Sequence, residues 1–188
     1  LDDYIKFRFV PSGHILNSAQ LELWITEGNL TKKIGYTSDL GNIHIHKYYT
    51  NNFEPIKKCD VLIGETTYAR ETYVANQKTR NKDLEKLETA IRQTCIDNNA
   101  RVLIPTFSND RCQNILTHLY DIFNEDEFFD IPILVDSPMS IKICEAYSNL
   151  LDGEDLDKWK KVIAWKNVQF VHEAVDSREW RNSGRPVI

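Results

Sequence analysis

Apolar and polar residues alternate in the first third of the chain in the way that β-strands require. The predicted strands are Tyr4–Val10, Leu21–Thr26, Lys33–Tyr36 and Val61–Glu65. Leu21, Leu23 and Ile25 occupy every second position, and turns containing Gly and Asn separate the segments. Because this period of two and these turn residues are typical of hairpins, we expect residues 1–68 to form an antiparallel sheet.

From about residue 79 the pattern changes to alternating helices and strands. Apolar residues at helical spacing predict helices over Asp83–Asp97, over 108–123 and from Ser137 to Leu150, with a short one over Asp176–Arg181. The strands predicted between and after them are Arg101–Thr106, Ile131–Asp136 and Val168–Val171. Such alternation is typical of a doubly wound parallel sheet, so we expect a second domain whose boundary with the first lies near residues 69–78.

Two serines are placed to begin helices in this second half. Ser108 precedes the helix that carries Cys112 and Phe123, and Ser137 precedes Pro138, which fits a first helical turn. The face of the later helix is expected to consist of Met139, Ile143, Tyr147 and Leu150. The segment Asp152–Lys161 is polar and carries no predicted element.

The composition is ordinary for a globular protein and excludes few classes of function. The 188 residues are 41% hydrophobic and 27% charged, with a net charge of -5 and a pI of about 5.6. No apolar run approaches the ~18–20 residues of a membrane span. The acidity argues against broad electrostatic binding of duplex nucleic acid. It does not exclude a metal-dependent nuclease, because bound cations neutralise a phosphate locally.

The cysteines and tryptophans are expected to have packing roles. Cys59, Cys95, Cys112 and Cys144 contain no C-x-x-C pair, so we expect reduced, buried thiols in a cytoplasmic protein. We expect the tryptophans to be core or surface anchors: Trp24, Trp159, Trp165 and Trp180.

Candidate chemistry lies where two of the predicted strands end. His14 follows a turn glycine after the first strand, and Asp39 follows Lys33–Tyr36. An imidazole and a carboxylate form a mixed ligand set that suits zinc or manganese. Two such ligands do not complete a metal site.

The residues around these positions resemble those of a known family. Gly13–Ala19 reads G-H-I-L-N-S-A and Tyr36–Asp39 reads Y-T-S-D, which resemble metal motifs of the metallo-β-lactamase fold. Their form is that of the β-CASP nucleases, which include RNase J and the endonuclease of mRNA 3′-end cleavage. Three later segments resemble further motifs of that family in the same order: Gly64–Tyr68, Val102–Leu116 and Val135–Ser140.

The resemblance implies an α/β fold with two domains. Residues 1–72 would be part of a metallo-β-lactamase (αββα) domain, and residues 73–188 a parallel-sheet, Rossmann-like β-CASP domain, incomplete at its C-terminus. Leu1 is not a natural start and Arg185–Ile188 reads as the beginning of a strand, so we expect an excised fragment.

The resemblance also implies roles for three side chains. His14 would bind one metal, Asp39 would bridge two metals, and Glu65 would orient a later histidine that helps to protonate the leaving oxygen. Each has a plainer alternative. His14 could be a turn histidine, Asp39 an ordinary turn residue, and Glu65 a carboxylate that caps the turn after it.

Substrate contacts are implied at two helix N-termini, where free N–H groups favour a phosphate. Ser108, Arg111 and Ser137 are the candidates. The alternatives are that the serines only cap their helices and that Arg111 forms an internal ion pair. His44 and His46 have the spacing of the family's H-x-H-x-D-H motif, but Lys47-Tyr48-Tyr49 follows, so we do not expect a metal site there. His118 and His172 read as ordinary helix and strand-end residues.

The chain departs from the family's motifs at several positions. Asn17 and Ser38 stand where the family's motifs usually have Gly. Ala69 stands where Gly usually follows the family's E-S-T-Y motif. Asn114 replaces a Glu, which puts the partners of that helix in doubt. No metal ligand is lost at these positions, but the H-x-H-x-D-H motif is absent from the chain.

The implied parent protein is a zinc-dependent ribonuclease with two zinc ions, acting on RNA in processing or decay. A nuclease directed at single-stranded DNA and a non-catalytic scaffold paralogue in an RNA-processing complex are the alternatives. We expect a cytoplasmic protein without a membrane segment; a homodimer stays open. The fragment alone is expected to be inactive and to bind zinc weakly or not at all.

Overall fold

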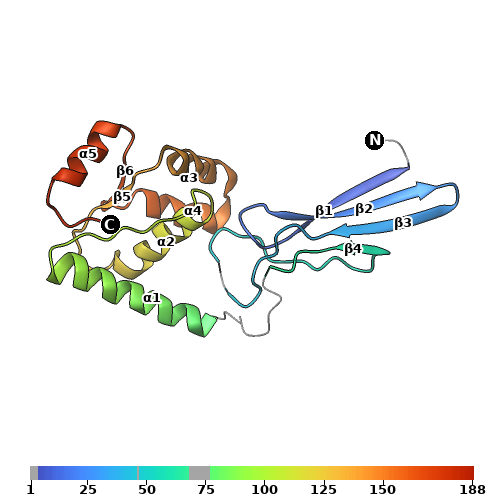
Figure 1. Cartoon of the computed structure of the whole chain (residues 1–188), viewed down its shortest axis with the longest axis horizontal. Coiled ribbons are helices and arrows are strands. Elements are labelled where there is room, and N and C mark those ends of the chain that lie inside the picture. Colours follow the sequence, from blue (N-terminus) through green and yellow to red (C-terminus); the bar gives the residue numbers. More distant parts are fainter. Residues whose placement is uncertain (1–3, 46, 68–76) are drawn as a thin grey trace. The chain divides into compact units, whose positions relative to one another are not determined.

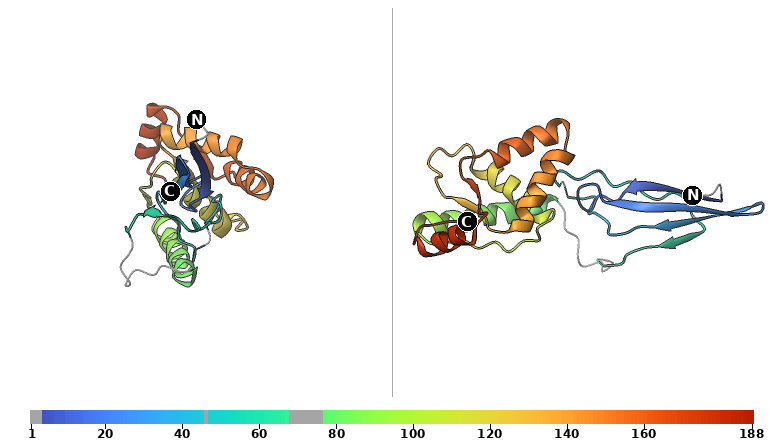
Figure 2. Two further views of the ribbon diagram at one scale, coloured as in Figure 1. Left: turned by 90° about the vertical axis from the view of Figure 1, so that its right-hand side faces the viewer. Right: turned by 90° about the horizontal axis from the view of Figure 1, so that it is seen from above.

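A computed structural model describes residues 4–45, 47–67 and 77–188 of the chain (Figures 1 and 2). They have the mixed α/β composition that the sequence predicts. The chain divides into two compact units, Leu1–Thr79 and Arg80–Ile188. The sequence placed the boundary between residues 72 and 73, and most of the predicted 69–78 seam lies outside the described residues.

The first unit is built on a four-stranded sheet in the order β1-β2-β3-β4. Its strands are β1 (Ile5–Pro11), β2 (Ala19–Glu27), β3 (Leu30–Tyr36) and β4 (Val61–Ile63). The first three pair antiparallel, as predicted, with Leu23 opposite both Phe7 and Ile34. The predicted antiparallel pairing is wrong for β4, which lies parallel to β3. Residues 37–60 connect these two strands, and a connection of that length can carry the chain back to the other end of the sheet.

The two faces of this sheet differ in polarity. Phe7, Leu23 and Ile34 share one face. The opposite face carries Glu22, whose side chain is 0% exposed. The Glu22 carboxylate accepts hydrogen bonds from Lys33 Nζ at 2.5 Å and Arg8 Nε at 2.7 Å. Burial raises the pKa of Glu22, but the two cations outweigh it and hold the pKa below its usual value. One carboxylate therefore ties together three strands.

The second unit contains helices and a short parallel sheet. The helices are α1 (Gln77–Ile91), the π-helix η1 (Arg92–Asp97), α2 (Arg111–Phe123), α3 (Pro138–Leu150), α4 (Gly153–Ile163) and α5 (Ala174–Asn182). The strands β5 (Ile133–Val135) and β6 (Val168–Phe170) pair parallel, in agreement with the predicted strand–helix alternation. Together α1 and η1 end at Asp97, where the predicted helix ends, and the last turn is wider than an α-helix.

The predicted strand over Arg101–Thr106 is wrong. The segment has no regular structure, and a bond from Val102 N to Val187 O (3.0 Å) joins it to the end of the chain. Leu103 is 91% exposed, so the apolar character of the segment does not reflect burial here. Ile188 instead extends the sheet beside β5, because Ile188 N bonds to Pro132 O (3.0 Å) and Leu134 N bonds to Ile188 O (2.8 Å). Ile188 thus bonds to the residues before and after Ile133, which is the hydrogen-bond pattern of a parallel strand pair.

Two features of the helices also differ from the sequence prediction. The polar segment Asp152–Lys161 lies mostly within α4, and its Trp159 is completely buried. In α3 the buried residues include Cys144 and Tyr147, whereas Met139 and Leu150 are exposed. The buried face of α3 is thus rotated away from the predicted one, although Tyr147 belongs to both.

The core of the second unit contains aromatic rings among aliphatic side chains. Phe123 and Phe129 stack with ring centroids 4.0 Å apart, and Trp159 Nε1 donates to Cys144 O at 3.2 Å. None of the helices in the described part of the chain is long and apolar enough to cross a membrane.

Candidate active site

Three strands of the first unit end at the same edge of the sheet. β2 is antiparallel to both β1 and β3, and β4 is parallel to β3. The C-terminal ends of β1, β3 and β4 therefore lie at the same edge of the sheet. His14, Asp39 and Glu65 each follow one of these ends. A hydrogen bond from Thr37 N to Ile63 O (3.0 Å) extends the pairing of β3 and β4 beyond the strands. The topology therefore places the three candidate residues in neighbouring loops.

The loop of His14 is a turn closed by Ser18. Ser18 Oγ accepts hydrogen bonds from His14 N and Ile15 N, both at 3.0 Å, and it lies 2.9 Å from Ser12 Oγ. Lys47 Nζ donates to His14 O at 2.8 Å. The backbone of the half-buried His14 is thus held from two sides.

The loop of Asp39 lies directly against the His14 turn. Gly41 N donates to Ser12 O at 2.9 Å. A Cβ at position 41 would lie 1.6 Å from Gly13 O, so only glycine permits this approach. The two loops that carry the predicted metal ligands are therefore in backbone contact.

Two departures from the family's motifs occur at strained backbone positions. Asn17 has a φ of 58° and Ser38 a φ of 55°. Glycine adopts this region without a steric cost, whereas Asn tolerates it and Ser rarely adopts it. The family's preference for glycine there has a conformational reason, and this chain keeps the conformation without it.

Glu65 is anchored beside Asp39. Its Oε1 accepts from Leu40 N at 2.7 Å and its Oε2 from Thr67 N at 3.3 Å. The hydrogen bond from the Thr67 side chain, then that from the Leu40 backbone, holds the pKa of Glu65 below its usual value, and the charge of His14 acts in the same direction. Glu65 thus lies within electrostatic reach of His14 and fixes the residue next to Asp39. The bond to Thr67 N is the turn-capping contact of the plainer alternative.

The described residues do not complete a metal site. No group of three or more His, Cys, Asp and Glu side chains within residues 4–45, 47–67 and 77–188 is arranged to hold a metal ion. His14 and Asp39 provide two donors, whereas zinc in proteins usually has three or four protein ligands. His44 lies in an exposed turn rather than on a strand, and His46 lies outside the described residues. Binding by His14 and Asp39 therefore stays a prediction.

The candidate substrate-binding residues belong to the second unit. The predicted cap at Ser108 is wrong, because the N-cap of α2 is Asp110 and the Ser108 carbonyl accepts from Gln113 Nε2 (3.1 Å). Arg111 forms an ion pair with Asp110, which was the alternative to a phosphate contact. The predicted cap at Ser137 is confirmed, since its Oγ accepts from Ser140 N at 3.3 Å. Contact of any of these three side chains with a substrate stays a prediction.

Polar residues buried along α2 were not foreseen from the sequence. Gln113, Thr117 and His118 are at most 6% exposed, and His118 Nε2 lies 2.7 Å from Arg80 Nη2. Asn114 Nδ2 donates to Asp110 O (3.0 Å) and Oδ1 (3.2 Å). The signal for them was the run of amide, hydroxyl and imidazole residues within an otherwise apolar helix.

The supports of the His14 loop, Ser18 and Lys47, were also not singled out from the sequence.

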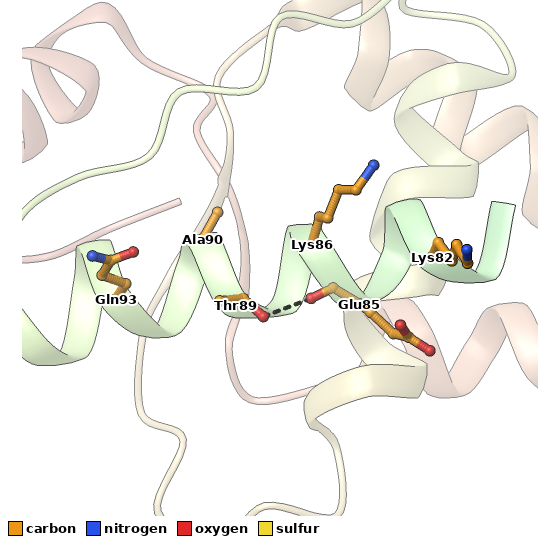
Figure 3. Close-up of a pocket in the computed structure, with 6 residues that line it drawn as sticks. All are labelled: Lys82, Glu85, Lys86, Thr89, Ala90 and Gln93. Carbon is orange, nitrogen blue, oxygen red and sulfur yellow. Dashed lines mark hydrogen bonds between the residues drawn. The ribbon is translucent and has the colours of Figure 1, made fainter. Parts of the chain in front are cut away.

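A separate hollow runs along the exposed side of α1, as Figure 3 shows, and none of the candidate residues lines it. Its mixed charges, from Lys82, Glu85 and Lys86, indicate a solvated helix face.

No family model matches the chain. Individual proteins do. An RNase J-like protein of Methanocaldococcus jannaschii is 34% identical over 140 residues, which is 74% of this chain and 31% of that protein. Cleavage and polyadenylation specificity factor 73 of Drosophila melanogaster is 27% identical over 164 residues, or 87% of this chain and 22% of that protein.

The endoribonuclease ysh1 of Schizosaccharomyces pombe is 28% identical over 177 residues, which is 92% of this chain and 21% of that protein. The chain thus spans between a fifth and a third of the length of these relatives. The similarities confirm the relationship that the motifs predict: the chain is homologous to part of the β-CASP nucleases of the metallo-β-lactamase fold.

Proposed function

We propose that this chain is part of a metal-dependent phosphodiester hydrolase that acts on RNA. The observation that carries the proposal is the convergence of the His14, Asp39 and Glu65 loops at one edge of the β1–β4 sheet. Two of these relatives bear names that denote RNA cleavage: the RNase J-like protein and the endoribonuclease ysh1. Homology and local geometry therefore support the same class of reaction.

The proposed roles follow from what each side chain contacts. The ring of His14 and the carboxylate of Asp39 are offered by adjacent turns, and we assign them as two of the metal ligands. Zinc suits such a nitrogen and oxygen pair. Since the described residues do not complete a site, further ligands are required, and the chain by itself is proposed to be inactive.

Glu65 is proposed to act by positioning. It holds Leu40 N at 2.7 Å and thereby fixes the backbone beside Asp39. Its lowered pKa keeps it ionised at neutral pH, so the acceptor for this N–H is permanently present. A carboxylate in this state supports a neighbouring ligand and is unsuited to donate a proton itself.

The decisive experiment is a cleavage assay of the full-length protein on 5′-labelled RNA and on single-stranded DNA of the same sequence. We expect cleavage of RNA in preference to DNA. His14→Ala and Asp39→Asn should abolish it, and Glu65→Gln should slow it by about 10- to 100-fold, as is usual for groups that orient a metal ligand. Glu27→Gln is the matched control, because Glu27 is exposed at the opposite edge of the sheet.

The outcomes separate the alternatives. Equal or better cleavage of DNA favours the DNA-directed nuclease. RNA binding without cleavage by the folded wild-type protein favours the non-catalytic scaffold. Full activity of Asp39→Asn would contradict the assignment of the site even if the protein cleaves RNA.

A further inference from the structure

The polar face of the β1–β2–β3 sheet carries a cluster of cations. The register places Trp24 between Lys6 and Lys33. One pair further along, Arg8 lies opposite Glu22. Side chains two residues apart in a strand share a face, so all five residues lie on one side of the sheet. Positive charge is thus gathered on the side opposite to the apolar face.

The one carboxylate of this cluster does not reach the surface. Glu22 is 0% exposed and is bonded to both Lys33 Nζ and Arg8 Nε. Lys33 is itself only 14% exposed, and its ammonium lies 5.1 Å from the centre of the Trp24 ring. The Arg8 side chain, in contrast, is 62% exposed, and Lys6 is exposed as well. The outward charge of the cluster therefore comes from Arg8 and Lys6.

The connection between β3 and β4 brings further cations to the same place. Lys33 Nζ also donates to the Lys57 carbonyl oxygen, and the side chains of Lys57 and Lys58 are both exposed. Asp60 is an acid of this connection, but its Oδ1 accepts from Lys32 Nζ and its Oδ2 from Lys33 N, both at 2.8 Å. Asp60 therefore offsets the charge of Lys32, and the surface around Lys57 stays basic.

The cations are close enough to act on one ligand. Lys6 and Arg8 are two residues apart along β1, or about 7 Å, and Lys6 and Lys33 are two strands apart, or about 10 Å. The Debye length at physiological ionic strength is about 8 Å, so neighbouring cations act together while more distant charges are screened. The net charge of the chain, -5, therefore does not cancel this local field. We call the following residues the basic face: Lys6, Arg8, Lys33, Lys57 and Lys58.

We propose that the basic face binds consecutive phosphates of a single-stranded RNA, outside the candidate active site. The inference rests on the proposed function, which makes RNA rather than an acidic protein the expected polyanion. Lys6 is five residues, or roughly 17 Å, from Pro11 at the end of β1 that leads to His14. Phosphate contacts at that distance hold and orient the strand without reading its sequence or taking part in the chemistry.

The test is binding of a short fluorescein-labelled oligouridine to the 188-residue chain, followed by anisotropy at several salt concentrations. The quantity to compare is the slope of log Kobs against log salt, which for single strands is about -0.7 for each phosphate neutralised. In the double variant Lys6→Gln and Lys57→Gln the slope should become shallower by about 1.4, because two phosphate contacts are lost.

The matched control is the double variant Lys160→Gln and Lys161→Gln. It removes the same charge from the exposed end of α4 and should leave the slope unchanged. Equal slopes in the two double variants, or no binding of oligouridine by the wild-type chain at low salt, would overturn the proposal. Tighter binding of polyglutamate than of an RNA of equal charge would also overturn it, since the partner would then be an acidic protein.

A second measurement does not depend on the folding of any variant. The native wild-type chain is acetylated with and without oligouridine, and its lysines are mapped. RNA should protect Lys6 and Lys57 but not Lys160, and equal acetylation of Lys6 and Lys57 under both conditions would contradict the proposal. Both assays measure binding by a chain that is proposed to be inactive. Failure of the full-length protein to cleave RNA would therefore refute the proposed function without changing these results.

Discussion

Gly41 has the least room for a side chain among the glycines of the chain. Its Cα approaches the Gly13 carbonyl so closely that an added Cβ would lie 1.6 Å from the oxygen. The obstacle is backbone rather than a movable side chain, so no rotamer change can relieve it. The contact between the His14 and Asp39 loops depends on this one absent methyl group.

We therefore predict that Gly41→Ala destabilises the first unit by about 3 kcal/mol, at the upper end of overpacking costs. The measurement is urea unfolding of the variant against the wild-type chain. Gly64→Ala is the control, because a Cβ there would meet Thr37 Cγ2 at an ordinary 3.6 Å, and its free energy of unfolding should change by less than about 1 kcal/mol. Equal effects of the two changes would contradict the close contact.

The carboxylate of Glu65 should make stability depend on pH in a defined direction. Its pKa is lower in the folded protein than the usual ~4.3 of the unfolded chain, because of the bonds from Thr67 and Leu40. The stabilisation is therefore fully present above the unfolded pKa and is lost as the pH falls through the folded pKa. The quantity to measure is the difference in free energy of unfolding between wild type and Glu65→Gln.

We expect this difference to be constant from about pH 6 to pH 8 and to shrink below about pH 4.3. The control is the exposed Glu27→Gln variant, whose free energy of unfolding should differ from wild type by less than ~0.5 kcal/mol. A difference that grows in acid would mean that the carboxyl is stabilised in its protonated form, against the arrangement described here.

At the scale of elements, the buried Glu22 joins β1, β2 and β3 through Arg8 and Lys33. Glu22→Gln leaves Lys33, which is only 14% exposed, without its counter-ion. We predict a loss of about 3 kcal/mol, the lower end for breaking a buried ion pair, since Arg8 can reach water. Lys32→Gln disrupts the exposed Lys32–Asp60 pair and should cost less than about 1 kcal/mol in the same unfolding experiment. Comparable losses would show that burial of Glu22 has no energetic role.

The helices show which elements the periodicity of apolar residues can predict. The spacing of apolar residues identified α2 and α3, although the buried face of α3 is not the predicted one. It missed α4, whose buried stripe is limited mainly to Trp159 and Val162 among charged residues. We predict that Trp159→Ala costs about 4 kcal/mol through the cavity it leaves, whereas Trp180→Ala, at a half-buried position on α5, costs less in the same assay.

For the molecule as a whole, the number of metal ligands limits how much zinc the chain can hold. We predict that the 188-residue chain retains less than one zinc ion per chain at neutral pH, because the described residues offer no complete ligand set. The measurement is equilibrium dialysis with elemental analysis, and His14→Ala should leave the zinc content unchanged. Stoichiometric zinc that disappears in His14→Ala would show that the site is complete within the chain.

Features that depend on neighbouring residues along the chain could be predicted from the sequence. Alternation with period two and local turns defined β1, β2 and β3 and their antiparallel order, and Ser137 before Pro138 defined the start of α3. The order of five motifs identified the family, which the relatives confirm.

Features that depend on residues distant along the chain became visible only in the folded structure. The parallel placement of β4 and the absence of a strand over Arg101–Thr106 are not encoded in any local period. Convergence of the His14, Asp39 and Glu65 loops is of the same kind, because it follows from which strand ends share an edge. Local preference fixes the backbone of an element, whereas its partners are fixed by burial and hydrogen bonding across the fold.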